Sequence, residues 1–167
     1  MAAGGKILVL GLGNALRGDD GVGVDVVDAL RRGGAEARRD VSVSARDGGT
    51  LGLALLPEIE SAWALIIVDA ARFGGAPGEL RVFEGAAMDA QVGRARSSVH
   101  EVALADLVGA ASLTGHLPAR RALVGVAPES TDWGLAPSAA VAAAVPAACA
   151  AIEGLLARWT APTPPAV

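Results

Sequence analysis

The segment ILVLGLGNALRGDDGVGVDVVDAL, residues 7–30, sets the fold of this chain. It begins with four apolar residues, Ile7 to Leu10, a short branched run that is typical of a buried strand. A glycine-rich turn and two adjacent carboxylates, Asp19 and Asp20, come next. The apolar residues that follow have the spacing of one helix face: Val22, Val26, Val27 and Leu30. The segment therefore predicts a strand, a turn and a helix, with both acids where the helix begins.

Two interpretations of this corner can be weighed from the residues. Asp19 is the natural N-cap of the helix, and a carboxylate near a helix N-terminus is favoured by about 0.3–1 kcal/mol. A dinucleotide-binding turn is disfavoured, because the third small residue of that fingerprint is replaced by Leu16. A phosphate placed here would also be repelled by the two acids.

Length and composition exclude several classes of protein. The 167 residues suit one domain, expected over residues 1–159, with a flexible tail over 160–167. A net charge of −4 without a basic block argues against nucleic acid as a partner. No membrane span and no secretory signal is expected, and the single Cys149 excludes an internal disulfide or a thiolate zinc site. We expect a cytoplasmic, monomeric enzyme or binding domain.

Five runs predict strands, over residues 6–12, 40–46, 63–69, 79–84 and 121–127. Only nine residues separate Asp69 from Glu79, too few for a parallel crossover, so these two strands should form an antiparallel hairpin with the second at the edge. Residues 85–96 show no clear period and are predicted as a loop, and a capping box at Ser98–Glu101 opens the next helix.

The C-terminal region carries a helical stripe that should pack on the sheet, interrupted by Pro146, which should kink or split the helix. The packed residues of this stripe are Val141, Val145, Ile152 and Leu155. Short branched runs that alternate with helical stripes predict an α/β fold. The expected architecture is a three-layer α/β/α sandwich with a mostly parallel, twisted five-stranded sheet and one antiparallel edge strand.

Polar residues follow the carboxyl ends of the predicted strands, where open α/β sheets bind their ligands. These residues are Asn14, Asp19, Asp20, Asp47, Asp69 and Glu129. A single acid in a loop is more often solvated than functional. Asp69 differs because it ends a fully apolar strand, so its carboxylate must be desolvated, paired or bound to a ligand.

Few side chains could complete a metal site of the nickel or zinc class, which prefers imidazole or thiolate ligands. Cys149 lies on the apolar stripe of the last helix and is predicted in the core, and His116 sits in a turn that should face solvent. For His100, in the first turn of a helix, a surface position and a ligand position remain equally open. Two carboxylates and one imidazole would make an open site, able to meet a metal already held by another molecule.

Five motifs, in this order, resemble the nickel–iron hydrogenase maturation endopeptidases. They are Gly11-x-Gly13-Asn14-x-Leu16-x-x-Asp19-Asp20-Gly21-x-Gly23, Asp47-Gly48-Gly49-Thr50, the apolar strand ending in Asp69, Ser98-x-His100, and Val124-Gly125-Val126-x-Pro128-Glu129-Ser130. Each motif is weak alone, but together they cover about residues 7–157 in register.

The resemblance implies a protease that removes the C-terminal extension of the hydrogenase large-subunit precursor after nickel insertion. It implies that nickel belongs to the substrate, so the isolated enzyme need not contain nickel. The family's catalytic and metal-contacting positions carry over to Asp20, Asp69 and His100. Some members have Glu at the first of these, which leaves Asp19 as the alternative ligand. The remaining motif residues are assigned to substrate binding: Asn14, Asp47, Gly48, Gly49, Thr50 and Glu129.

Two other functions stay open at this point. One is a metal-dependent hydrolase with its own bound ion and a small substrate. The other is a nickel-sensing chaperone that binds the precursor without cutting it. A metal-polarised carbonyl or a metal-bound water would explain hydrolysis without a serine or cysteine nucleophile.

Overall fold

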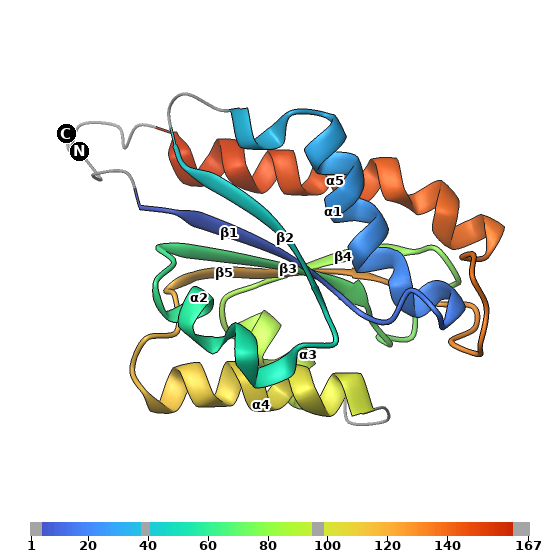
Figure 1. Ribbon diagram of the computed structural model, residues 1–167, viewed down its shortest axis with the longest axis horizontal. Helices are drawn as coiled ribbons and strands as arrows, with labels where there is room; N and C mark the ends of the chain where they lie inside the picture. The colour runs from blue at the N-terminus through green and yellow to red at the C-terminus, as the bar shows by residue number, and fades with distance from the viewer. Residues whose placement is uncertain (1–4, 38–40, 95–98, 162–167) are drawn as a thin grey trace.

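The computed structural model describes residues 5–37, 41–94 and 99–161, with the backbone alone at Ala37, Val99 and His100. Within these residues, five strands form one sheet in the spatial order β2-β1-β3-β5-β4 (Figure 1). The strands are β1 (Ile7–Leu12), β2 (Val43–Gly49), β3 (Ala64–Ala70), β4 (Leu80–Glu84) and β5 (Arg120–Val126). The helices are α1 (Val22–Arg32), α2 (Leu56–Glu60), α3 (Ala86–Arg94), α4 (Val99–Leu113) and α5 (Ala139–Thr160), with short 3₁₀ turns at Gly18–Gly21, Ala35–Ala37 and Gly52–Leu55.

The sheet has a reversal of strand order at its centre. Strand β1 pairs in parallel with β2 on one side and with β3 on the other, and β3 pairs in parallel with β5. The chain leaves β1 toward β2 and then returns to the opposite side of β1 as β3. Open α/β sheets bind ligands in the crevice outside the strand ends at such a point. The carboxyl ends of β1 and β3 therefore mark where a site is expected.

Helices cover both faces of the sheet, which gives the predicted three layers (Figure 1). Alternate residues of β1 point to opposite faces, so Ile7 and Val9 join a core with α1 and α5, and Leu8 and Leu10 join a second core with α2, α3 and α4. Both cores are apolar, which explains why the central strands read as continuous apolar runs. The α/β sandwich with a mostly parallel sheet is confirmed.

Helix α5 packs its apolar stripe on the sheet as predicted. Val141, Ile152 and Leu155 are buried, and Val145 packs at the edge of the same core. Pro146 does not split the helix, which is assigned without interruption. By length and composition α5 could cross a membrane, the one such helix among the described residues. Its buried stripe is that of a core helix that packs on a sheet.

Two predictions about the middle of the chain were wrong in part. Strand β4 is an antiparallel edge strand, but it pairs with β5, which lies between β3 and β4, so no hairpin with β3 forms. Residues 85–96 were predicted as a loop, yet residues 86–94 form α3. Its buried face follows a helical spacing of three and four residues, carried by Met88, Gln91 and Val92.

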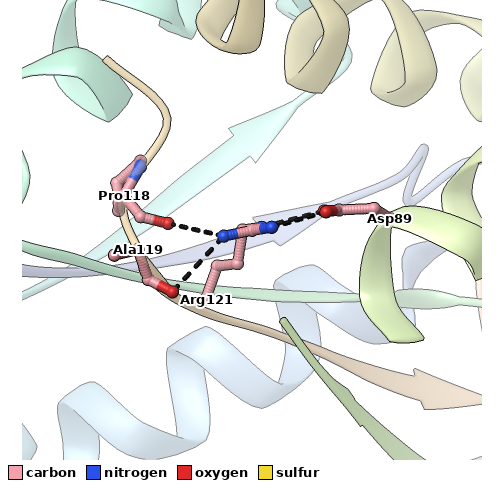
Figure 2. A network of polar contacts seen from close by, with 4 residues as sticks. All are labelled: Asp89, Pro118, Ala119 and Arg121. Atoms are coloured by element: carbon pink, nitrogen blue, oxygen red, sulfur yellow. Dashed lines mark hydrogen bonds and ion pairs between the residues drawn. The ribbon is translucent and has the colours of Figure 1, made fainter. Parts of the chain in front are cut away.

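An ion pair joins α3 to β5 at the end of the sheet where β5 begins (Figure 2). The Arg121 guanidinium donates from Nε to Asp89 Oδ1 at 2.8 Å and from Nη2 to Asp89 Oδ2. Its Nη1 also donates to the carbonyl oxygens of Pro118 and Ala119. This fork-shaped pairing fixes α3 against the sheet.

Candidate active site

The glycine-rich turn after β1 brings the backbone of residue 20 against Gly13. Gly13 has a φ of 117°, and a Cβ added there would lie 1.8 Å from the Asp20 carbonyl oxygen. A Cβ on Gly23 would lie 2.3 Å from the Val68 carbonyl oxygen, so this glycine lets α1 approach β3. The glycines of the motif therefore serve close backbone packing around Asp20.

Hydrogen bonds within the turn hold the Asp20 carboxylate, which is 8% exposed. Its Oδ2 accepts from the Asn14 backbone N–H at 2.9 Å, and its own N–H donates to the Arg17 carbonyl oxygen. The Asn14 side chain accepts from the Leu16 N–H, which closes a local turn typical of Asn. Asn14 thus shapes the loop that positions Asp20.

Asp69 is the next-to-last residue of β3 and is 4% exposed. Its Oδ1 has no hydrogen-bond partner among the described residues, and this oxygen would lie 3.5 Å from a Cβ built on Gly13. Burial raises the pKa of Asp69 well above its usual range, and the negative charges of Asp20 and Glu101 raise the pKa further. The hydrogen bond from the Ala70 backbone N–H lowers this pKa, but it does not offset the other effects. Two acids thus lie near each other where β1 and β3 end.

Small pockets flank Asp69 on two sides, and both share the side chain of Leu104. The first is bounded by Gly49 at the end of β2, by Thr50 in the following loop, and by α4. The second is bounded by Gln91 of α3 and Glu101 of α4. Asp69 therefore forms part of the wall of both pockets.

Sequence reasoning missed Gln91 and Glu101 as neighbours of the site. Gln91 is 7% exposed and donates from Nε2 to the Arg72 carbonyl oxygen at 3.0 Å. Glu101 was interpreted only as part of a capping box, and Ser98, the other half of that box, lies outside the described residues. The position of Glu101 directly after His100 was the one available signal.

The three candidate imidazole and thiolate ligands lie in different environments. His100 lies in the first turn of α4, as predicted, but its side chain lies outside the described part of the structure. His116 is exposed after α4, and Cys149 is partly buried against the core, with its Sγ 3.8 Å from the Val26 carbonyl oxygen. The side chains described form no cluster of three His, Cys, Asp or Glu residues suited to a metal ion.

The prediction that Asp19 caps the first helix was wrong. The cap position of α1 is Gly21, and no side chain bonds there. Asp19 is fully buried and its carboxylate accepts from the N–H groups of Glu129, Ser130 and Ser138 and from the Ser138 hydroxyl, at 2.6–3.1 Å. Burial alone would raise the pKa of Asp19, but these bonds outweigh it and lower the pKa. Asp19 anchors the loop between β5 and α5.

Known proteins resemble this chain over most of its length. The sequence pattern of the hydrogenase maturation protease family matches residues 24–155. The chain belongs to this family. HupD, a hydrogenase expression/formation protein of Rhodobacter capsulatus, is 38% identical over 156 residues, which cover 92% of this chain and 72% of HupD.

A curated sequence and a solved structure from Escherichia coli agree with that assignment. The hydrogenase 2 maturation protease is 38% identical over 130 residues, which cover 76% of each protein. The structure of the hydrogenase maturating endopeptidase HybD matches with a TM-score of 0.81 and 32% identity over 92% of this chain and 93% of HybD. The resemblance found in the sequence is confirmed. This member of the maturation protease family is a hydrolase of peptide bonds that acts in hydrogenase maturation.

The residues assigned to substrate binding in this family member fall into two groups. Gly49 and Thr50 line a pocket beside Asp69. Asn14, Asp47, Gly48 and Glu129 line neither of the two pockets described above. Asp47 and Glu129 are exposed, and a Cβ on Gly48 would lie 2.8 Å from the Leu12 side chain.

Proposed function

We propose that the protein removes the C-terminal extension of a nickel–iron hydrogenase large-subunit precursor after nickel insertion, and that it recognises the metal in that substrate. The observation that carries this proposal is the buried Asp69 carboxylate. One of its oxygens lacks a hydrogen-bond partner among the described residues, and a second acid, Asp20, lies close enough to raise its pKa. A buried, unpartnered carboxylate costs free energy, which a cation brought by the substrate would recover.

The proposed ligands of the substrate's nickel are Asp20, Asp69 and His100. Their positions support an open site: Asp20 lies in the turn after β1, Asp69 lies near the end of β3, and His100 precedes Glu101, which lines the second pocket. In this proposal Asp20 contacts the metal, because the carboxylate of Asp19 already accepts four hydrogen bonds. The metal would act as a Lewis acid on the peptide carbonyl or on a water.

The remaining residues of the sequence motifs bind and orient the substrate in this proposal. Gly49 and Thr50 offer a backbone wall beside Asp69, where an extended peptide can approach closely. Asp47 and Glu129 would contact the substrate from exposed positions, Asn14 shapes the turn that carries Asp20, and Gly48 allows close packing next to Asp47. In this proposal the protein acts as a cytoplasmic monomer, its partner is the hydrogenase large-subunit precursor, and the nickel is carried by that precursor.

Intact mass spectrometry of the nickel-loaded precursor, before and after incubation with the protein, tests the proposal. A mass loss equal to the C-terminal extension is the expected result. An unchanged mass with complex formation would favour a non-cleaving chaperone. Metal analysis of the isolated protein adds a second criterion, because a tightly held stoichiometric ion would favour a hydrolase with its own metal and a small substrate.

A further inference from the structure

Two loops beside the site expose three large apolar side chains. Leu16 lies in the turn after β1, and Trp133 and Leu135 lie in the loop between β5 and α5; their exposed fractions are 53%, 75% and 86%. We call these three residues the apolar platform. Exposed apolar side chains that gather on neighbouring loops mark an interaction surface more often than isolated ones do.

The platform is held by backbone hydrogen bonds between the two loops. The Gly18 N–H donates to the Gly134 carbonyl oxygen at 3.0 Å, and the Gly134 N–H donates to the Leu16 carbonyl oxygen at 2.9 Å. Arg17 adds two further links, since its guanidinium carbon lies 5.3 Å from the centre of the Trp133 ring and its Nε donates to the Thr131 carbonyl oxygen. The buried Asp19 carboxylate fixes the same loop at Ser138.

This rigidity separates the platform from an ordinary solvent-exposed loop. A surface whose conformation is fixed before binding loses little conformational entropy when a partner docks. Trp and Arg are also the residue types that contribute most at protein interfaces. The stacked pair of Trp133 and Arg17 therefore has the chemistry of a binding surface.

The platform is continuous with the proposed active site. The Arg17 carbonyl oxygen accepts from the Asp20 N–H, and the Asn14 N–H donates to the Asp20 carboxylate, so one short turn carries both Leu16 and Asp20. Both loops follow the carboxyl ends of parallel strands, the end of the sheet where Asp69 lies (Figure 1). A protein whose peptide bond reaches Asp20 and Asp69 must cover the rim next to them.

We infer that the apolar platform docks apolar side chains of the hydrogenase precursor, an inference that rests on the proposed function. The precursor is the occupant because the turn that carries Leu16 also carries Asp20, so a protein that is cut beside Asp20 and Asp69 would also cover the platform. A second copy of this chain on the platform would obstruct the rim beside Asp20, which disfavours self-association there. The platform would supply affinity, and the acids would supply the reaction.

The test compares two leucines of nearly equal exposure in different places. Leu135 in the platform is 86% exposed, and Leu113 at the end of α4 is 91% exposed. We expect Leu135→Ala to weaken binding of the precursor several-fold, and Trp133→Ala combined with Leu135→Ala to raise KM about tenfold with kcat little changed. Leu113→Ala should behave as the wild-type protein, and circular dichroism should show native folding for all three variants.

Precursor binding by surface plasmon resonance, measured together with cleavage, separates failure of this inference from failure of the proposed function. If the wild-type protein binds the precursor but never shortens it, the proposed function fails, and the platform is supported whenever its variants still weaken binding. If the platform variants bind and process the precursor as Leu113→Ala does, the inference is overturned. It is also overturned if the wild-type protein dimerises and the platform variants are monomeric, because the occupant is then a second copy.

Discussion

Asp19 and Asp69 are two buried carboxylates at the same end of the sheet, with opposite surroundings. Asp19 accepts four hydrogen bonds from Glu129, Ser130 and Ser138, and its pKa is lowered. Asp69 has an oxygen without a partner among the described residues, and its pKa is raised. One acid is therefore stabilised as an anion by the fold, whereas the other is destabilised as an anion.

The difference distinguishes a structural acid from a candidate functional one. Buried charges that serve the fold are satisfied by hydrogen bonds, as Asp19 is. A strongly perturbed acid beside a second acid, at the end of a central strand, is the pattern found at functional sites. Burial alone does not separate the two residues, since both are nearly inaccessible, but their hydrogen bonds do.

The largest expected effect is on activity. Asp69→Asn removes the negative charge and preserves the shape, so processing of nickel-loaded precursor should fall at least about 100-fold, a typical loss for one electrostatic contact at a reacting group. The fold should persist, because a neutral amide is easier to bury than an unpaired carboxylate. A gel assay of precursor cleavage, with circular dichroism on the same sample, measures both. A folded Asp69→Asn protein with wild-type activity would contradict the proposed site.

The next effect is on stability. Asp19→Asn should destabilise the fold by about 1–3 kcal/mol, because an amide NH₂ must face at least one of the N–H donors that the carboxylate now accepts. The matched comparison is Asp69→Asn, which should leave the stability unchanged or raised. Urea denaturation of both variants gives the two values. Equal stabilities for the two variants would remove the proposed distinction.

The pH dependence of stability should differ in sign between the two acids. The pKa of Asp19 is lowered in the fold, so its contribution is present above the unfolded value near 3.9 and is lost as the pH falls through the folded pKa. The pKa of Asp69 is raised, so it opposes folding increasingly as the pH rises above about 4 toward its folded pKa.

Urea denaturation at pH 4.5 and at pH 7 measures the contribution of Asp69, because the contribution of Asp19 is nearly constant in this range. Relative to the wild-type protein, Asp69→Asn should gain stability between the two values, since it no longer has the carboxylate that resists ionisation. A stability difference that is independent of pH would show that Asp69 ionises normally in the fold.

The sequence predicted the parts of this comparison that depend on local pattern. The apolar run before Asp69 identified a central strand, and Asp69 stood out as an acid that burial would perturb. The partners of Asp19 were not predictable, because Ser138 is 119 residues away along the chain. Neither capping preference nor periodicity reports a contact of that range, so Asp19 was interpreted from its immediate neighbours alone.

The same limit explains the errors in the sheet. The short link between β3 and β4 correctly indicated an antiparallel edge strand, but it could not show that β5 would insert between them. Helix α3 was missed although Met88 and Val92 have helical spacing, because the segment is short and its polar Gln91 lies on the buried side. Gln91 of α3 and Glu101 of α4 line the same pocket as Asp69, through a packing of the two helices that no single motif records.

The smallest expected effect concerns a third carboxylate, Asp89, which pairs with Arg121 (Figure 2). Arg121 lies at the start of β5, whereas Asp69 pairs with Gly125 near the end of β5. Asp89→Asn keeps one acceptor for the guanidinium and removes the charge attraction of a partly exposed ion pair, whose side chains are 38% and 17% exposed. The stability should fall by about 1 kcal/mol or less. Cleavage of the precursor should stay near the wild-type rate, because the cores on both faces of the sheet remain intact. If Asp89→Asn instead lowered cleavage as much as Asp69→Asn does, activity would be lost on removal of any carboxylate. The difference in hydrogen bonding between Asp19 and Asp69 would then not identify a functional acid.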